Sequence, residues 1–168
     1  VEVDRNTKRV VRIRPEFFPS NTKVLPACLA RLQALKSLIL DHCKELTCFP
    51  AGVWFPQLEE LAIDVTGFKK PFPASFGNHT KLQKLVVRGT CTSLEHWSRY
   101  KGSEESHNSR DDDITEDTSH LLFPPSMAKL THLNHLETHI RNLLQIPSSV
   151  LEMLSCSLET LVTTQDLV

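Results

Sequence analysis

The chain has 168 residues, of which 40% are hydrophobic. This length corresponds to about one domain, and the apolar content is sufficient for a hydrophobic core. Its formal net charge of −1 at pH 7 excludes a nucleic-acid or membrane surface that acts through bulk positive charge. No apolar run approaches the roughly 18 residues that span a bilayer, and no signal peptide is visible. Because the first residue is Val1 rather than Met, we expect a fragment of a longer protein.

The cysteines indicate the compartment. There are 5 of them, an odd number without a paired C-x-x-C framework, which favours a reducing environment and predicts a cytoplasmic location. The tripeptide Asn78-His79-Thr80 matches the glycosylation acceptor pattern and favours an extracellular location instead. Such tripeptides are common by chance, so the cysteines carry more weight.

Residues 1–24 are predicted to form a degenerate first repeat or a cap. A turn-prone Asp4-Arg5-Asn6 segment precedes a strand-like stretch over residues 9–13, in which Val11 and Ile13 are expected to match Leu38 and Leu40 of the next unit. Phe17, Phe18 and Pro19 are expected to fold over the opposite side of that unit.

Residues 25–50 hold the first full repeat. Leucines occur every three residues from Leu29 to Leu38, and then Leu38 and Leu40 lie two apart. Residues two apart point the same way only on a strand, so the change of period predicts a turn followed by a strand rather than an amphipathic helix.

The same pattern recurs along the chain. Leu35, Leu38 and Leu40 return 23 residues later as Leu58, Leu61 and Ile63, and 24 residues after that as Leu82, Leu85 and Val87. Each unit also has an upstream apolar-proline dipeptide: Leu25-Pro26, Phe49-Pro50, Phe72-Pro73, Phe123-Pro124 and Ile146-Pro147. Regular repeats are therefore predicted over residues 25–97 and C-terminal repeats over residues 121–168.

Residues 98–120 interrupt the repeats. This segment is polar and acidic, so it cannot offset the entropy of ordering and is predicted to be a disordered excursion. A degenerate repeat in the gap is the alternative, but nothing there reads L-x-x-L-x-L.

A period of 20 to 29 residues with L-x-x-L-x-L is the signature of the leucine-rich repeat. The predicted fold class is accordingly α/β: a leucine-rich-repeat solenoid, or horseshoe, with a short-stranded parallel sheet on its concave side and turns or short helices on its convex side. The unit from Leu25 to Pro50 resembles the repeats of plant nucleotide-binding immune receptors, which confer disease resistance. That resemblance implies ligand sensing or autoinhibition.

The resemblance covers residues 25–94 well and residues 123–161 loosely. In this family the third residue after the strand is usually Asn, Cys or Thr, and Cys43, Thr66 and Thr90 fit, whereas Arg141 and Asp166 do not. No G-x-x-x-x-G-K-[ST] motif occurs, so ATP binding is not implied and no cofactor is expected.

The remaining histidines and cysteines give weaker signals of chemistry. His132, His135 and His139 are the best metal candidates, with Glu137 on the same strand face, but the pattern is not H-E-x-x-H and no metal site is predicted. Cys43 is expected to be a buried bend residue and Cys48 a packing residue. No catalytic motif is present, so we expect no enzyme.

The strand positions between the core leucines are predicted to form a concave protein-binding face. Its candidate residues are Lys36, Ile39, Asp41, Glu59, Glu60, Ala62, Asp64, Lys84, Val86 and Arg88, flanked by Arg9, Arg12, Arg14, His42 and the histidines of the later repeat. The expected partner is a protein: a pathogen effector, a host protein or another domain of the same receptor, with no nucleic acid and no membrane insertion. A solvated face with merely balanced charges is the first alternative, and an extracellular receptor domain that binds a peptide or glycan is the second.

Overall fold

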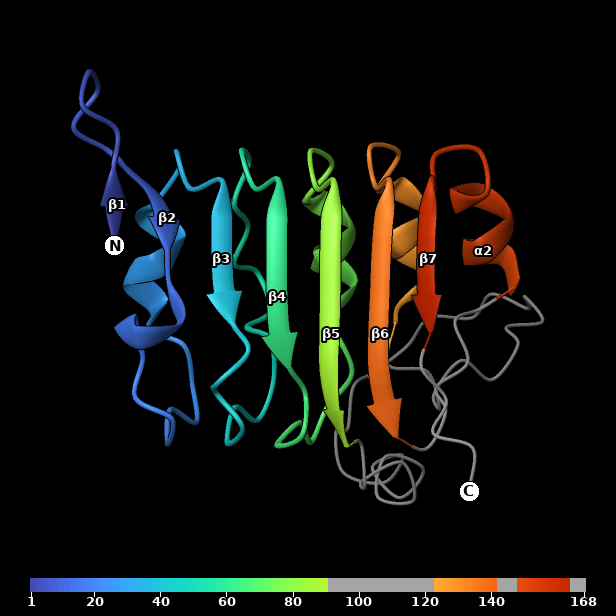
Figure 1. Ribbon diagram of the computed structural model, residues 1–168, viewed down its shortest axis with the longest axis horizontal. Helices are drawn as coiled ribbons and strands as arrows, with labels where there is room; N and C mark the ends of the chain where they lie inside the picture. Colours follow the sequence, from blue (N-terminus) through green and yellow to red (C-terminus); the bar gives the residue numbers. More distant parts are fainter. Residues whose placement is uncertain (91–122, 142–147, 164–168) are drawn as a thin grey trace, which may run out of the picture.

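The computed structural model describes residues 1–90, 123–141 and 148–163 (Figure 1). The predicted excursion over residues 98–120 and the dipeptide Ile146-Pro147 lie outside these ranges. The described part of the chain is an α/β structure whose seven strands form one sheet in chain order, from β1 to β7. The strands are β1 Glu2–Val3, β2 Val10–Ile13, β3 Ser37–Leu40, β4 Glu60–Asp64, β5 Lys84–Thr90, β6 His135–Arg141 and β7 Thr160–Thr163.

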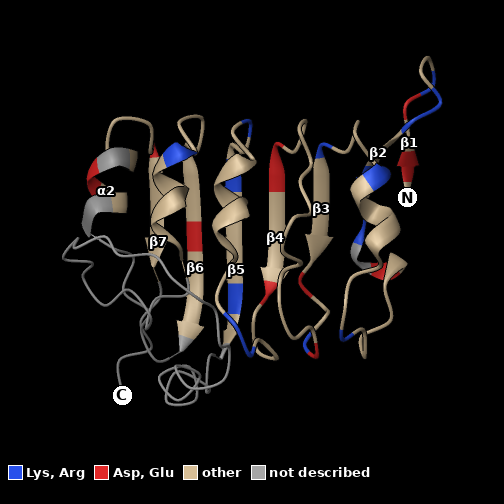
Figure 2. Ribbon diagram, turned by 180° about the vertical axis from the view of Figure 1, so that it is seen from behind, with Lys and Arg blue, Asp and Glu red and all other residues tan. Residues whose placement is uncertain are grey.

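The described helices are short. They comprise the 3-10 helices η1 Pro15–Phe17, η2 Ala27–Arg31, η3 Ala74–Asn78 and η6 Pro125–Lys129, and the α-helix α2 Ser148–Leu154. The longer of these, η2, η3, η6 and α2, lie on one side of the sheet, behind the strands in Figure 1 and in front of them in Figure 2. Pro26, Pro73 and Pro124 directly precede η2, η3 and η6 with extended backbone angles. The apolar-proline dipeptides therefore mark where these helices begin.

The sheet is parallel except at its first pair. β1 and β2 form an antiparallel hairpin, and every later pair from β2 to β7 is parallel. The same backbone hydrogen bond recurs just before each strand from β3 to β7. Its donors and acceptors are Lys36 N to Val11 O, Glu59 N to Lys36 O, Gln83 N to Glu59 O, Asn134 N to Gln83 O and Glu159 N to Asn134 O. One local conformation is thus repeated five times along the sheet.

The predicted register of the central strands is confirmed. Leu38, Leu61, Leu85, Leu136 and Leu161 are partners across β3 to β7, and Leu40, Ile63 and Val87 form the next row. The expected match of the first unit is wrong by two residues, because Ile13 pairs with Leu38. β2 ends at Ile13, and Pro15, which lacks a backbone donor, begins η1 two residues later.

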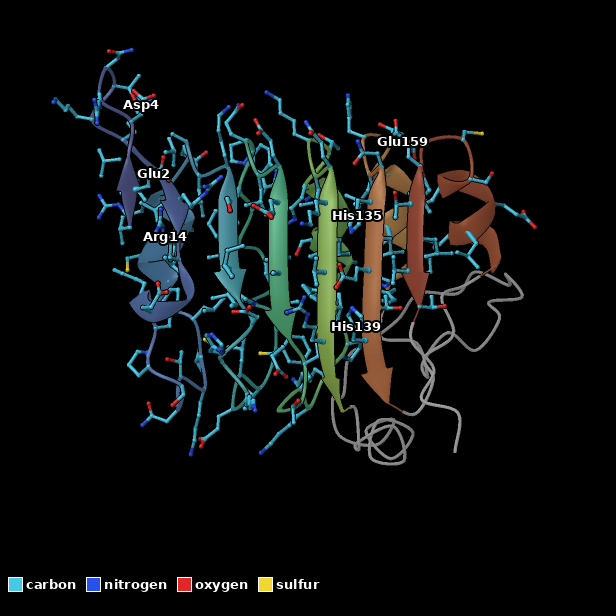
Figure 3. The ribbon with its side chains drawn as sticks, in the orientation of Figure 1. Glu2, Asp4, Arg14, His135, His139 and Glu159 are labelled. Carbon is cyan, nitrogen blue, oxygen red and sulfur yellow. The ribbon has the colours of Figure 1, made fainter. Side chains whose placement is uncertain are left out.

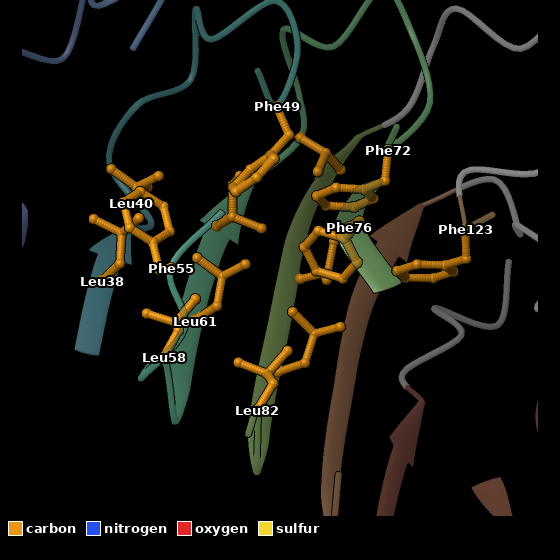
Figure 4. Packing of buried hydrophobic residues seen from close by; sticks show 14 of the residues in the cluster. Leu38, Leu40, Phe49, Phe55, Leu58, Leu61, Phe72, Phe76, Leu82 and Phe123 are labelled. Atoms are coloured by element: carbon orange, nitrogen blue, oxygen red, sulfur yellow. The ribbon is translucent and has the colours of Figure 1, made fainter. Parts of the chain in front are cut away.

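The core lies between the sheet and the helices (Figure 4). Buried leucines from the strands meet a layer of phenylalanines supplied largely by the Phe-Pro dipeptides. The ring centroids of Phe72 lie 4.6 Å from Phe76 and 5.8 Å from Phe123, the second pair being stacked. Such pairs contribute about 0.5–1.5 kcal/mol each beyond their buried area. Phe18 joins the core as expected, whereas Phe17 is 51% exposed and does not.

His79 is a buried polar residue in this apolar layer. Repeated hydrogen bonds show that it occupies the position held by Leu32, Phe55 and Leu130 in the other units. Its Nδ1 lies 2.8 Å from the carbonyl oxygen of Phe76, while its Nε2 has no hydrogen-bond partner among the described residues. Burial lowers the pKa of His79 below its ordinary value.

Candidate functional site

The face of the sheet opposite the short helices is the candidate site, and no described helix covers it (Figure 1). Because side chains alternate along a strand, the residues between the core leucines point to this open face. The strand register arranges them in three rows. The amino-end row is Arg12, Ser37, Glu60, Lys84, His135 and Thr160; the middle row is Ile39, Ala62, Val86, Glu137 and Val162; the carboxyl-end row is Asp64, Arg88 and His139, with Asp41 beside Asp64 after the end of β3.

The amino-end row is held by contacts between neighbouring strands. Ser37 donates its hydroxyl hydrogen to Glu60 over 2.9 Å, and the Lys84 ammonium lies 3.7 Å from the same carboxylate. Lys36 and Glu59 form a 2.9 Å ion pair with each other. Both residues precede their strands and lie at the edge of the sheet rather than in the row. Ser37, which the sequence reasoning missed, occupies the row position on β3; it directly precedes Leu38, and that spacing could have identified it.

The carboxyl-end row combines two acids with one arginine. Asp64 is almost buried and accepts a 2.8 Å hydrogen bond from the backbone of Thr66. Arg88 lies 4.0 Å from the Asp41 carboxylate, so its side chain spans the intervening strand. Gly89 lets the backbone of β5 pass close to Asp64, because a Cβ at this position would stand 2.6 Å from the Asp64 carboxylate oxygen. Its φ of +124° also favours glycine.

Glu137 connects the rows on β6. Its carboxylate contacts His139 at 2.5 Å, Arg88 at 3.2 Å and His135 at 3.4 Å. The hydrogen bond with His139, helped by those with Arg88 and His135, lowers the pKa of Glu137 to about 2 against the opposing effect of burial. Figure 3 shows His135 and His139 along the same strand on the open face. The expectation that His135, Glu137 and His139 share this face is confirmed.

The rest of the middle row is apolar, and its two central members are little exposed. Ala62 is 8% exposed and Val86 4%, because the rows on either side carry longer side chains. Apolar positions at the middle of a binding face commonly supply its desolvated centre, and Ile39, Ala62 and Val86 hold those positions here. Most of what a partner meets at this centre is instead the surrounding layer of charged groups.

The other predicted groups lie apart from this network. His132 precedes β6, and its ring nitrogen Nδ1 lies 2.9 Å from the backbone oxygen of Thr80. Within the described ranges, no group of three His, Cys, Asp or Glu side chains is arranged to hold a metal ion. Cys43 is buried at its bend and Cys48 is half-buried, as expected. Cys28, Cys43, Cys48 and Cys156 are all free thiols.

Comparison with known proteins does not identify the chain, since no family model matches it and no curated protein matches it significantly. None of the helices over residues 1–90, 123–141 and 148–163 has the length and apolar character needed to cross a membrane.

Proposed function

We propose that the chain is a leucine-rich-repeat solenoid that binds a protein through the open face of its sheet. The repeated backbone hydrogen bond at five strand starts supports the solenoid, because each unit repeats one conformation against its neighbour. The sequence resemblance of residues 25–50 extends the proposal to the repeat domain of a cytoplasmic plant immune receptor, in ligand sensing or autoinhibition, with no catalytic role. Its partner is a pathogen effector, a host protein or another domain of the receptor.

One observation carries the binding proposal: the open face holds charges of both signs at fixed positions. Glu60 and Asp64 on β4 alternate with Lys84 and Arg88 on β5, and each group is tied to a neighbour on an adjacent strand or to backbone. A surface of alternating sign has no general attraction for a polyanion such as nucleic acid. It instead matches a protein surface of complementary pattern, which sets the partner's register.

Charge reversal tests the face. Glu59→Lys with Glu60→Lys should strongly weaken capture of protein partners from the native source and reduce the salt sensitivity of the remaining binding. The matched control is Lys69→Glu with Lys70→Glu, two exposed residues that lie outside the three rows. Equal losses from both pairs, or no loss from either, would contradict docking on the open face. Circular dichroism of each variant checks that the fold is kept.

An extracellular peptide- or glycan-binding domain is the second candidate, because Asn78 is exposed at the end of η3 and accessible to glycosylation. Intact-mass analysis of the protein from its native source separates the two proposals. A glycan on Asn78 supports the extracellular domain. Unmodified Asn78 together with reduced cysteines supports the cytoplasmic one, as would a nucleotide-binding module upstream in the full-length protein.

A further inference from the structure

A basic hollow of about 490 Å³ lies beside the amino ends of β2 and β3. The hollow is lined by Lys8, Arg9 and Val10 and by residues 31–34, which run from the last residue of η2 toward β3. The exposed lining residues include three cations, Lys8, Arg9 and Arg31, whereas Val10, Leu32 and Ala34 are half-buried. Figure 2 shows basic residues on the loop between β1 and β2 and on the helix in front of β2.

The cations of the hollow have no acidic partners in the described part of the chain, and no acid lines the hollow. The two acids of the nearby hairpin are engaged elsewhere. Asp4 accepts hydrogen bonds from the backbone of Asn6 and Thr7 at 3.0 and 2.7 Å, and Glu2 lies 3.7 Å from Arg12. The three positive charges are therefore left for a group from outside the described chain.

Lys8 also occupies a costly backbone position. Its φ of +55° lies in the left-handed region, where glycine or asparagine is favoured. The turn is closed by backbone hydrogen bonds from Lys8 N to Asp4 O and from Asp4 N to Arg9 O, so neither bond requires a lysine side chain. A glycine would hold this turn with less strain but would remove one of the three charges from the hollow.

We propose that this hollow binds an acidic peptide segment in which carboxylates flank an apolar side chain. The three cations would pair with the carboxylates, and the apolar side chain would contact the half-buried Val10, Leu32 and Ala34. Inorganic phosphate would leave this apolar part of the lining unused. Single-stranded nucleic acid is less suited, because the lining has no aromatic ring on which a base can stack. The site uses no residue of the open face and is independent of the function proposed above.

Fluorescence anisotropy with a labelled peptide, Glu-Asp-Leu-Asp-Glu, tests the site. The amide analogue Gln-Asn-Leu-Asn-Gln keeps the shape and removes the charge. The full chain is compared with Arg9→Gln plus Arg31→Gln, with Lys8→Gly, and with the control Lys69→Gln plus Lys70→Gln. Circular dichroism and thermal unfolding accompany each variant, and an oligonucleotide and inorganic phosphate serve as competitors.

We expect saturable binding of the acidic peptide that weakens as salt rises from about 0.05 to about 0.5 M, and at least about tenfold weaker binding of the amide analogue. The double arginine variant should lose about tenfold in affinity, and the control less than about twofold. Lys8→Gly should weaken binding while raising the unfolding temperature, a combination that a purely structural lysine would not produce. Equal losses in the control, equal binding of the amide peptide, no peptide binding at all, or more effective competition by the oligonucleotide or phosphate would overturn the proposal.

Discussion

Replacing Leu61 by alanine tests the core most directly. Leu61 is fully buried in the middle of the leucine row, between Leu38 on β3 and Leu85 on β5. The change removes three buried carbons, worth about 2.4 kcal/mol at about 0.8 kcal/mol each. The cavity left between two flanking strands raises the expected loss of unfolding free energy to about 3–5 kcal/mol.

Leu161→Ala is the matched control for this loss. Leu161 belongs to the same row on β7 but is 49% exposed, because β7 is the last strand of the described sheet. Because about half of this side chain is already exposed, Leu161→Ala loses only about half of the transfer free energy and leaves no closed cavity. We therefore expect the free energy of unfolding to fall by about 1 kcal/mol. Urea unfolding followed by far-ultraviolet circular dichroism measures both variants, with the slope against urea compared to the parent. Equal losses of unfolding free energy at the two positions would contradict the difference in burial between Leu61 and Leu161, and with it this strand register.

Three further changes follow from particular contacts. His79→Leu, which installs the residue found at the equivalent position 32, should raise the stability of the fold below pH 6.5. The pKa of His79 is lowered in the folded state, so the stability associated with its neutral form is present above pH 6.5 and is lost as pH falls. Thermal unfolding across pH should therefore show this loss in the parent but not in the variant. Glu137→Gln should remove a second loss of stability, at more acidic pH. The Glu137 carboxylate, whose pKa is lowered from 4.5 to about 2, stabilises the fold above pH 4.5 and ceases to do so as pH falls toward about 2. An acid unfolding profile unchanged by the substitution would contradict this. Gly77→Ala should cost about 1–3 kcal/mol of unfolding free energy, because a Cβ there would stand 2.2 Å from the Ser126 carbonyl oxygen. Gly52→Ala meets no atom within 4 Å and should cost only about 1 kcal/mol, because its φ is +75°. Chemical denaturation that ranked the two variants in the opposite order would show that the backbone around Gly77 can relax.

The composition of the open face could be predicted only in part from the sequence. Taking the residue that directly follows each core leucine correctly places Ile39, Ala62 and Val86 in one row. The same reasoning could not show that this row is nearly covered, because exposure depends on the length of side chains on neighbouring strands. Arg88 and Asp41 are 47 positions apart in the chain and meet only because the sheet sets β3, β4 and β5 side by side.

The first unit shows where local pattern fails. Val11 and Ile13 have the right spacing for the core row, yet Ile13 alone pairs with Leu38 while the oxygen of Val11 accepts a hydrogen bond from Lys36. A shift of two residues keeps every side chain on the same face, so hydrophobic period alone does not distinguish the two registers. The hairpin with β1 and the 3-10 helix that begins at Pro15 accompany the observed register.

The sequence by itself determined the leucine rows and the strand positions of the central units. These depend on contacts that each unit repeats with the next, so a period in the chain becomes a period in space. Only the tertiary structure decided the partners of Glu137, the burial of His79 at an apolar position, and the basic hollow between residues 8–10 and 31–34. The physical reason is that charge interactions and burial depend on distances between separate units, and those distances arise only when neighbouring strands and turns pack together.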